Sequence, residues 1–220
     1  MLEKIQREVL IRLKDIPEVQ SFFLTGGTAL SAFYLFHRKS NDLDFFTSEE
    51  ELIQPFSYKI EEALRQKNFV VERRRGFRSF VKLMVSLSTE STIIHLAFDS
   101  PFRLEPVREA EDFPGIKIDS LPDIAANKLL ALFSRATLRD FIDVYFLVME
   151  KLRKDELIHK ASTKDPGFDL YWLGTSFGRI HEFSPDTPEM HLLVKPCYWE
   201  DLLRFFSDWQ REIFKELSRG

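Results

Sequence analysis

The feature that most constrains the fold is a strand, a glycine pair, a helix and a second strand in close succession. The apolar run SFFLT at residues 21–25 indicates a β-strand, which Gly26-Gly27 interrupts. Helix formers fill residues 28–37, where Thr28 is a candidate N-cap. After the turn RKSN, polar and apolar residues alternate in DLDFF at residues 42–46. This alternation predicts the second strand of a compact strand–helix–strand unit.

Three more strand-like segments follow in the first half of the chain. They lie at residues 69–75, 79–88 and 92–98, and Gly76 predicts a hairpin between the first two. The next stretch, DSPFRLEPVREAEDFPG, holds three prolines and is predicted to be a loop.

After residue 119 no strand is predicted: residues 139–153 should be helical, and residues 162–196 should form a loop around one helix near residues 168–180. Ser120 with Asp123 three residues later forms a helix start signal, and residues 198–219 carry an apolar stripe at helical spacing. We therefore predict an α+β chain. Residues 1–118 would form a core with a small mixed sheet flanked by helices, and residues 119–220 a helical part packed on that core.

Composition restricts the classes of function. Hydrophobic residues make up 44% of the 220 and charged residues 30%, which is ordinary for a soluble globular protein. The net charge of -4 means that any nucleic-acid contact must come from a local patch. A single cysteine, Cys197, indicates a reducing compartment. The sequence has no long apolar run, and its N-terminus carries charges throughout. We therefore expect a cytoplasmic protein without a membrane span or signal peptide.

Asp42 and Asp44 are one residue apart in a predicted strand. Their side chains point to the same face, with Cα atoms roughly 6.5–7 Å apart, whereas Leu43 points the other way. Two carboxylates this close raise each other's pKa unless a positive charge lies between them. Mg²⁺, held by one or two carboxylates and by phosphate oxygens, would satisfy the pair. The alternative is a solvated strand face with two charges by chance.

The glycine pair favours the first alternative. Gly26-Gly27 precedes a predicted helix, and the unpaired N–H groups and dipole of a helix N-terminus attract phosphate. Most glycine pairs only make turns, but this one lies within 20 residues of the acidic strand. Arg38, in the connecting turn, is a further source of positive charge. The unit therefore predicts a phosphate cradle beside two metal-binding carboxylates.

Two stretches of the sequence resemble a known family. FLTGGTALSAFYLFHRKSNDLDFFT and DSLPDIAANKLLALFSRATLRDFIDVYFL look like the two signatures of the AbiEii/AbiGii toxin family, in the polymerase-β-like nucleotidyltransferase superfamily. They occur in the expected order, and residues 48–118 between them match mainly in their strand layout. The resemblance implies a polymerase-β-like nucleotidyltransferase fold and transfer of a nucleoside monophosphate from an NTP.

The same resemblance implies roles for individual residues. Asp42 and Asp44 would bind two Mg²⁺ ions that clamp the attacking and leaving oxygens. Lys128 would contact the nucleotide phosphates, and Asp140 or Asp143 would have a positioning role. The residues expected to bind the nucleotide are Gly26, Gly27, Thr28, Arg38, Ser40, Lys128, Arg139, Asp140 and Asp143.

The residues of the second signature carry cations at helical spacing. Lys128, Arg135 and Arg139 would lie on one side of a continuous helix, where they would suit a phosphate. The alternative is a solvated helix face with surface ion pairs, such as Arg139 with Asp143.

The third carboxylate of the superfamily is the point where the resemblance weakens. It is expected on the strand TIIHLAFDS, where His95 stands at the aligned position and Asp99 follows. Asp99 would complete a catalytic and metal-binding set with Asp42 and Asp44, or His95 would replace it as base or ligand. Two alternatives are a weakened site and a strand histidine with an ordinary hydrogen bond.

The hairpin ERRRGFRSFVK is basic. Its cations and phenylalanines would suit a phosphate backbone and a stacked base, so RNA is an expected partner. The alternative is an edge hairpin that uses charge to prevent strand aggregation. The cations are Arg73, Arg74, Arg75, Arg78 and Lys82.

Together these features predict a Mg²⁺-dependent nucleotidyltransferase with tRNA or another RNA as acceptor. The resemblance implies a toxin of a toxin–antitoxin or abortive-infection system, with a cognate antitoxin as partner. One alternative is a catalytically weakened module that binds nucleotide or a partner protein. Another is a nucleotidyltransferase that modifies a small molecule.

Overall fold

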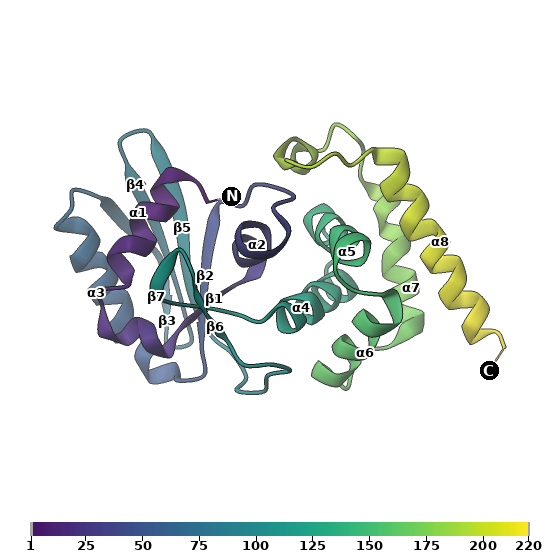
Figure 1. Cartoon of the computed structure of the whole chain (residues 1–220), viewed down its shortest axis with the longest axis horizontal. Helices are drawn as coiled ribbons and strands as arrows, with labels where there is room; N and C mark the ends of the chain where they lie inside the picture. The colour runs from purple at the N-terminus through teal and green to yellow at the C-terminus, as the bar shows by residue number, and fades with distance from the viewer. Residues whose placement is uncertain (1, 220) are drawn as a thin grey trace. The chain divides into compact units, whose positions relative to one another are not determined.

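The computed structural model describes residues 2–219, and the chain divides into two compact units. The first unit comprises Met1–Tyr34 and Lys39–Ser120, and the second comprises Leu35–Arg38 and Leu121–Gly220 (Figure 1). The chain therefore contributes a short segment between α2 (Gly26–Leu30) and β2 (Asp42–Thr47) to the second unit, and it returns to that unit at Leu121.

The first unit is built on a seven-stranded sheet of order β3-β4-β5-β2-β1-β7-β6. The pairs β2–β5 and β1–β7 are parallel and the other pairs are antiparallel, so the predicted mixed sheet is confirmed. The strands are β1 (Phe23–Thr25), β2 (Asp42–Thr47), β3 (Val70–Phe77), β4 (Phe80–Leu87), β5 (Glu90–Phe98), β6 (Arg108–Ala110) and β7 (Phe113–Ile118).

Two helices cover one face of this sheet. Helix α1 (Lys4–Leu13) and helix α3 (Ile53–Arg65) lie on the same side, and α2 lies on the opposite side (Figure 1). The strands explain this arrangement, because every second residue of β2 is buried: Leu43 and Phe45 have no exposed surface. Asp42 and Asp44 alternate with them and therefore lie on the other face.

Helix α2 begins earlier than the sequence predicts. It spans Gly26–Leu30 and continues as a π-helical turn over Ser31–Leu35. Thr25 is the residue before its first turn, so the prediction of Thr28 as N-cap is wrong. The glycine pair is itself the first turn of the helix rather than a linker before it.

The prediction of a loop before residue 119 is also wrong in part. Strands β6 and β7 form there, and β7 pairs in parallel with β1 through Phe23↔Lys117 and Leu24↔Ile118. Ile116 and Ile118 are fully buried, and this burial stabilises β7 although Pro114 and Gly115 precede the two residues. Short strands with proline and glycine resemble loops in composition, which is why the pattern missed them.

The second unit is helical, as predicted, with an aromatic core. Phe206 of α8 contacts Phe141 and Phe177, with ring centroids 4.8 Å and 5.2 Å away, and Trp209 is 2% exposed. The sequence pattern did not predict helix α6 (Lys154–Lys164). Within residues 2–219 no helix combines the length and apolarity that crossing a membrane requires. The helices are α4 (Leu121–Ser134), α5 (Leu138–Glu150), α6 (Lys154–Lys164), α7 (Leu170–Gly178) and α8 (Trp199–Leu217).

Candidate active site

Gly26 and Asp44 meet on the sheet face that α1 and α3 leave free. Thr25 is the register partner of Asp44, so the first residue of α2 comes next to the acidic strand. Gly26 has a φ of +71°, and a Cβ atom there would lie 2.4 Å from Asp44 Oδ2. A side chain would both strain the backbone and collide with the carboxylate. The position therefore requires glycine, and the structure brings the glycine pair and the acidic strand together.

Thr28 has a structural side-chain contact, whereas for Ser40 the structural contact is made by the backbone. Thr28 is 1% exposed, and its hydroxyl donates to the backbone carbonyl of Asp42, which ties α2 to β2. The carbonyl of Ser40 accepts a hydrogen bond from Gln6 Nε2 at 2.8 Å. The hydroxyl of Thr28 is thus occupied, and its expected contact with a nucleotide is not supported.

Asp42 and Asp44 are half-buried on one face of β2, as predicted. Within residues 2–219 the carboxylate of Asp42 has no hydrogen-bond or ion-pair partner. Asp44 accepts one hydrogen bond, from His95 Nδ1 at 2.8 Å, and is 24% exposed. Mg²⁺ is typically held by one or two carboxylates together with substrate phosphates and water. A pair of partly open carboxylates on one strand face fits that donor set.

His95 occupies the position beside Asp44 on the neighbouring strand. Asp44 and His95 are register partners of the parallel pair β2–β5. The imidazole contacts the Asp44 carboxylate and also the ring of Phe80, whose centroid is 5.6 Å away. The bond is made at Nδ1, and within residues 2–219 Nε2 has no hydrogen-bond partner.

Asp99 does not join this set. It lies beyond the end of β5, four residues after His95, which is roughly 13 Å along a strand. Its backbone N–H donates to the carbonyl of Thr47 and its carboxylate is 3.4 Å from Arg103. In the part of the chain that the structure describes, no three histidine, cysteine or acidic side chains are grouped so that they could hold a metal. The expected cluster of Asp42, Asp44 and Asp99 is therefore not found.

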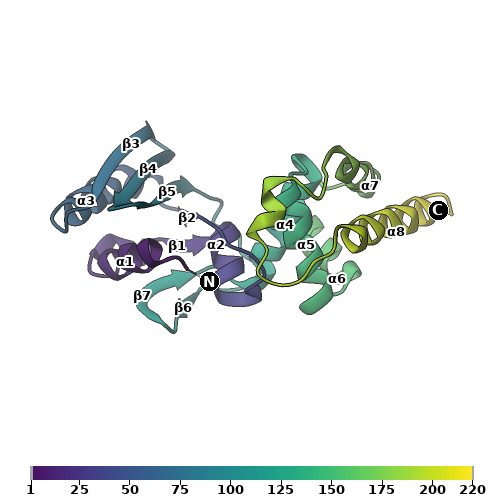
Figure 2. The same cartoon turned by 90° about the horizontal axis from the view of Figure 1, so that it is seen from above.

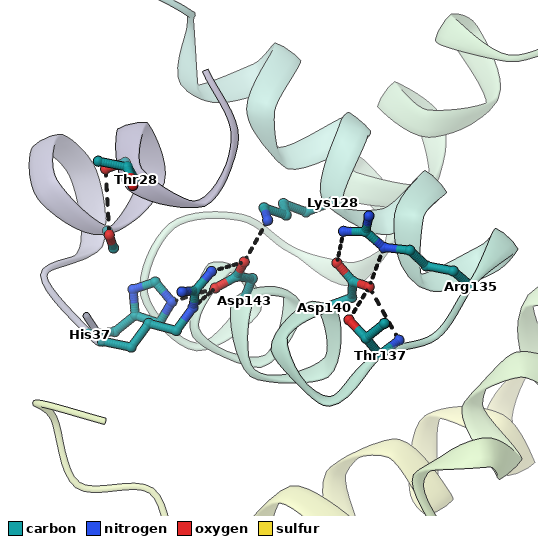
Figure 3. A network of polar contacts seen from close by, with 9 residues as sticks. Thr28, His37, Lys128, Arg135, Thr137, Asp140 and Asp143 are labelled. Carbon is teal, nitrogen blue, oxygen red and sulfur yellow. Dashed lines mark hydrogen bonds and ion pairs between the residues drawn. The ribbon is translucent and has the colours of Figure 1, made fainter. Parts of the chain in front are cut away.

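A second group of charges is centred on Asp143, within the helical unit (Figure 3). Its carboxylate is fully buried and accepts hydrogen bonds from Arg38 Nε at 2.7 Å and Arg38 Nη2 at 2.8 Å. His37 Nε2 lies 2.7 Å away and Lys128 Nζ 2.7 Å away. The segment Leu35–Arg38 thus joins the helical unit through a buried network of one acidic and three basic side chains.

The electrostatics of this network follow from its burial. Burial alone would raise the pKa of Asp143, but the charges of Lys128 and Arg38, with hydrogen bonds from Arg38 and His37, hold this pKa well below its usual range. Burial lowers the pKa of His37 and outweighs the opposing hydrogen bond to Asp143. At neutral pH the network therefore contains an ionised Asp143, two cations and a neutral imidazole.

These contacts change the expected role of Arg38. Its side chain is 2% exposed and forms a bidentate pair with Asp143, so it is a buried structural residue rather than an open phosphate ligand. Lys128 has the same partner but is 11% exposed. Its contact with a nucleotide phosphate stays a prediction.

The helix of the second signature is not continuous. Helix α4 ends at Ser134 and α5 begins at Leu138, with Ala136 at a φ of +47° between them. Lys128, Arg135 and Arg139 therefore do not share one helix side, and that prediction is wrong. Arg139 is exposed, without an ion pair to Asp143 in residues 2–219.

Asp140 completes a helix start. It accepts hydrogen bonds from Thr137 N and Thr137 Oγ1, at 3.2 Å and 2.6 Å, and a bidentate pair from Arg135 (Figure 3). Burial would raise the pKa of Asp140, but the hydrogen bond from Arg135 and the charge of Lys128 lower it. Its contacts are those of a capping box, which orders the first turn of α5.

Comparison with known proteins gives the family. A family model described as "Nucleotidyl transferase AbiEii toxin, Type IV TA system" matches residues 8–189. The chain belongs to this family. The predicted family is thus confirmed, and the AbiEii match includes both signatures.

Similar proteins agree over nearly the whole chain. An uncharacterized protein of Aquifex aeolicus, aq_aa25, is 29% identical over 208 residues and covers 93% of this chain and 94% of its own. A candidate nucleotidyltransferase from H. pylori is 21% identical with a TM-score of 0.63, covering 98% of this chain and 94% of its own. MenT4, a nucleotidyltransferase toxin of Mycobacterium tuberculosis, is 17% identical with a TM-score of 0.59, covering 97% and 90%. These structures confirm the predicted nucleotidyltransferase fold.

The basic hairpin of this AbiEii chain is mostly neutralised. Arg73 pairs with Glu61 of α3 at 2.6 Å, and Arg74 and Arg78 pair with Glu72 and Glu50 at 2.6 Å and 2.8 Å. The two remaining cations have no acidic partner within residues 2–219. They are Arg75 and Lys82.

The sequence did not single out two residues that the structure connects to the site. His37 belongs to the Asp143 network, and the only available signal was its position next to Arg38. Asp119 is fully buried and accepts a hydrogen bond from Thr25 Oγ1 at 2.7 Å, which fixes the end of β1 just before Gly26. Asp119 and Thr25 are 94 residues apart, so no local pattern could join them.

Proposed function

We propose that this AbiEii family member is a Mg²⁺-dependent nucleotidyltransferase that moves a nucleoside monophosphate from an NTP to an RNA acceptor such as tRNA. The observation that carries the proposal is the packing of Gly26 against Asp44, with the carboxylate of Asp42 free beside it. This geometry supports a triphosphate on the glycine turn and a metal on the two carboxylates.

In this proposal each element of the reaction has its own residues in the first unit. The backbone N–H groups of Gly26 and Gly27 bind the triphosphate, and Asp42 and Asp44 hold Mg²⁺. When bound, Mg²⁺ neutralises charge on the attacking and leaving oxygens of an in-line displacement. His95 is the register partner of Asp44, and its Nε2 atom would orient the attacking hydroxyl.

Incubation of the purified protein with each labelled NTP, Mg²⁺ and total tRNA tests the proposal. The native chain should transfer label to RNA, and Asp42→Asn with Asp44→Asn should abolish the transfer. Asp112→Asn, an exposed change outside the site, is the control and should retain activity. Absence of transfer with all four NTPs would refute the proposal, and label on a small molecule without RNA would replace the acceptor class.

His95 favours one other candidate function. A histidine beside Asp44, in place of a third carboxylate, would suit a module that binds Mg²⁺ and NTP but turns over slowly or not at all. Calorimetry separates the two functions, because this candidate requires NTP binding without product. Appearance of transfer activity in His95→Asp would support it further.

A further inference from the structure

A row of side chains crosses the sheet in register with Asp44. Asp44 is opposite His95, His95 is opposite Lys82, and Lys82 is opposite Arg75. Directly opposed residues on neighbouring strands share a face of the sheet. With strands about 4.8 Å apart, the backbones of Lys82 and Arg75 lie roughly 10 Å and 14 Å from that of Asp44. Figure 2 shows the three strands β3, β4 and β5 side by side.

The row extends away from the glycine turn. The strand order β3-β4-β5-β2-β1 places Gly26, at the end of β1, on one side of Asp44 and Lys82 on the other. An NTP on the glycine turn would therefore leave the side of Lys82 and Arg75 to the second substrate.

A β-bulge directs Arg75 to this face. Residues two apart in a regular strand share a face, so Arg73 and Arg75 would point the same way. The register shifts between them, however, and Arg73 is opposite the fully buried Leu83 whereas Arg75 is opposite Lys82. Arg73 accordingly contacts Glu61 of α3, and Arg75 lies on the face of Asp44.

Arg75 and Lys82 are like charges in directly opposed positions, which destabilises a sheet. The other three arginines of the hairpin each have a glutamate partner, whereas these two have none in the described chain. Arg75 and Lys82 therefore form a cationic pair in the row of Asp44, and an anionic ligand would offset their repulsion.

The neighbouring row identifies the ligand class. Phe77 is opposite Phe80, two residues further along the same strands and therefore on the same face, and Phe77 is 63% exposed. Exposed aromatic rings beside cations are typical of surfaces that bind single-stranded nucleic acid, because bases stack on the rings and phosphates pair with the cations.

We propose that Lys82 and Arg75 form a phosphate-binding subsite for a single-stranded nucleic-acid end whose terminal hydroxyl reaches Asp44. The subsite deepens the proposed function and rests on it for the direction of the strand. The acceptor phosphates bind Lys82 and Arg75, and Phe77 with Phe80 supports the adjacent bases.

The test uses the full-length protein and a fluorescein-labelled single-stranded RNA oligonucleotide. Binding is measured by anisotropy over a range of salt concentrations for Arg75→Gln with Lys82→Gln. The matched control is Arg74→Gln with Arg78→Gln, which removes the same charge from the same hairpin. Loss of two phosphate contacts should reduce the slope of log K against log salt by about 1.4, at about 0.7 per contact for single strands. The control should change the slope much less.

The outcomes separate the subsite from the proposed function. Equal slopes for the two double variants, or no binding by the native chain, would overturn the subsite even if nucleotide transfer is observed. A selective loss for Arg75→Gln with Lys82→Gln in a protein without transfer activity would support the subsite and refute the enzyme. Affinity for Mg²⁺–NTP should be equal in both double variants, because the glycine turn lies on the other side of Asp44.

Discussion

Replacement of Arg38 by methionine should destabilise the helical unit selectively. Arg38→Met keeps most of the aliphatic volume but removes the guanidinium that binds both oxygens of Asp143. The side chains of Arg38 and Asp143 are 2% and 0% exposed, so water cannot replace the lost contact. Asp143 would retain Lys128 and a neutral His37 as partners.

The expected loss is large for a single side chain. Removal of one partner of a buried ion pair costs about 3–5 kcal/mol, because the remaining charge stays buried with too few partners. In a protein of this size each kcal/mol lowers the Tm by about 2–4 °C, which gives a decrease of roughly 6–20 °C for this transition. Lys39→Met is the matched control: Lys39 is the next residue, but it is 57% exposed and 3.3 Å from Glu3. A surface pair of this kind contributes little.

Tryptophan fluorescence is a suitable assay. All three tryptophans, Trp172, Trp199 and Trp209, belong to the second unit, so their emission during urea unfolding reports on the unit that contains Asp143. Arg38→Met should move the midpoint to lower urea with an unchanged slope, which marks a change of stability. If Arg38→Met and Lys39→Met shift the midpoint equally, the reasoning from the buried network is refuted.

Three further outcomes follow from the structure. Burial lowers the pKa of His37 below the unfolded value of 6.5, so below that pH the unfolded chain binds a proton that the folded chain does not bind. The free energy of unfolding should therefore fall as the pH decreases below about 6.5, by up to about 1.4 kcal/mol per pH unit. Urea titrations at several pH values should show a smaller pH dependence for His37→Gln. Gly26→Ala should lower the free energy of unfolding by about 1–2 kcal/mol because of the left-handed backbone, and its Cβ should displace Asp44. Calorimetry should therefore show weaker Mg²⁺–NTP binding for Gly26→Ala than for Gly27→Ala, since the backbone φ of Gly27 is not positive. Burial raises the pKa of Cys197 to about 11, so a thiol reagent at pH 8 should modify the folded protein far more slowly than the unfolded chain.

The fold was predictable where local periodicity was strong. The alternation of polar and apolar residues gave β2, and the apolar stripe gave α8, because each pattern reflects burial of one face. Strand β7 was not predictable in this way, since its pairing partner β1 is about ninety residues earlier in the chain and Pro114 obscures its pattern. The break between α4 and α5 was also hidden, because Ala136 adopts a left-handed conformation that its residue type does not suggest.

The candidate site was predictable in its elements but not in its partners. Gly26, Asp42 and Asp44 are close in sequence and share one strand–helix–strand unit, so spacing alone brought them together. The pairing of Asp44 with His95 depends on the order of strands, which the sequence does not specify. The separation of Arg75 from the neighbouring arginines depends on a bulge, which shifts the register by one residue without a sequence signal.

Arg38 of the first family signature and Lys128 of the second both contact the carboxylate of Asp143. With Asp143 ionised and His37 neutral, Arg38 alone balances the charge of Asp143, so Lys128 adds one positive charge in excess. Arg38 is also the bidentate partner, whereas Lys128 makes one contact and is 11% exposed against 2% for Arg38. Removal of Lys128 should therefore destabilise the helical unit less than removal of Arg38. Lys128 carries this excess charge on the more exposed side chain, and its contact with a nucleotide phosphate stays a prediction, whereas Arg38 neutralises the carboxylate of Asp143.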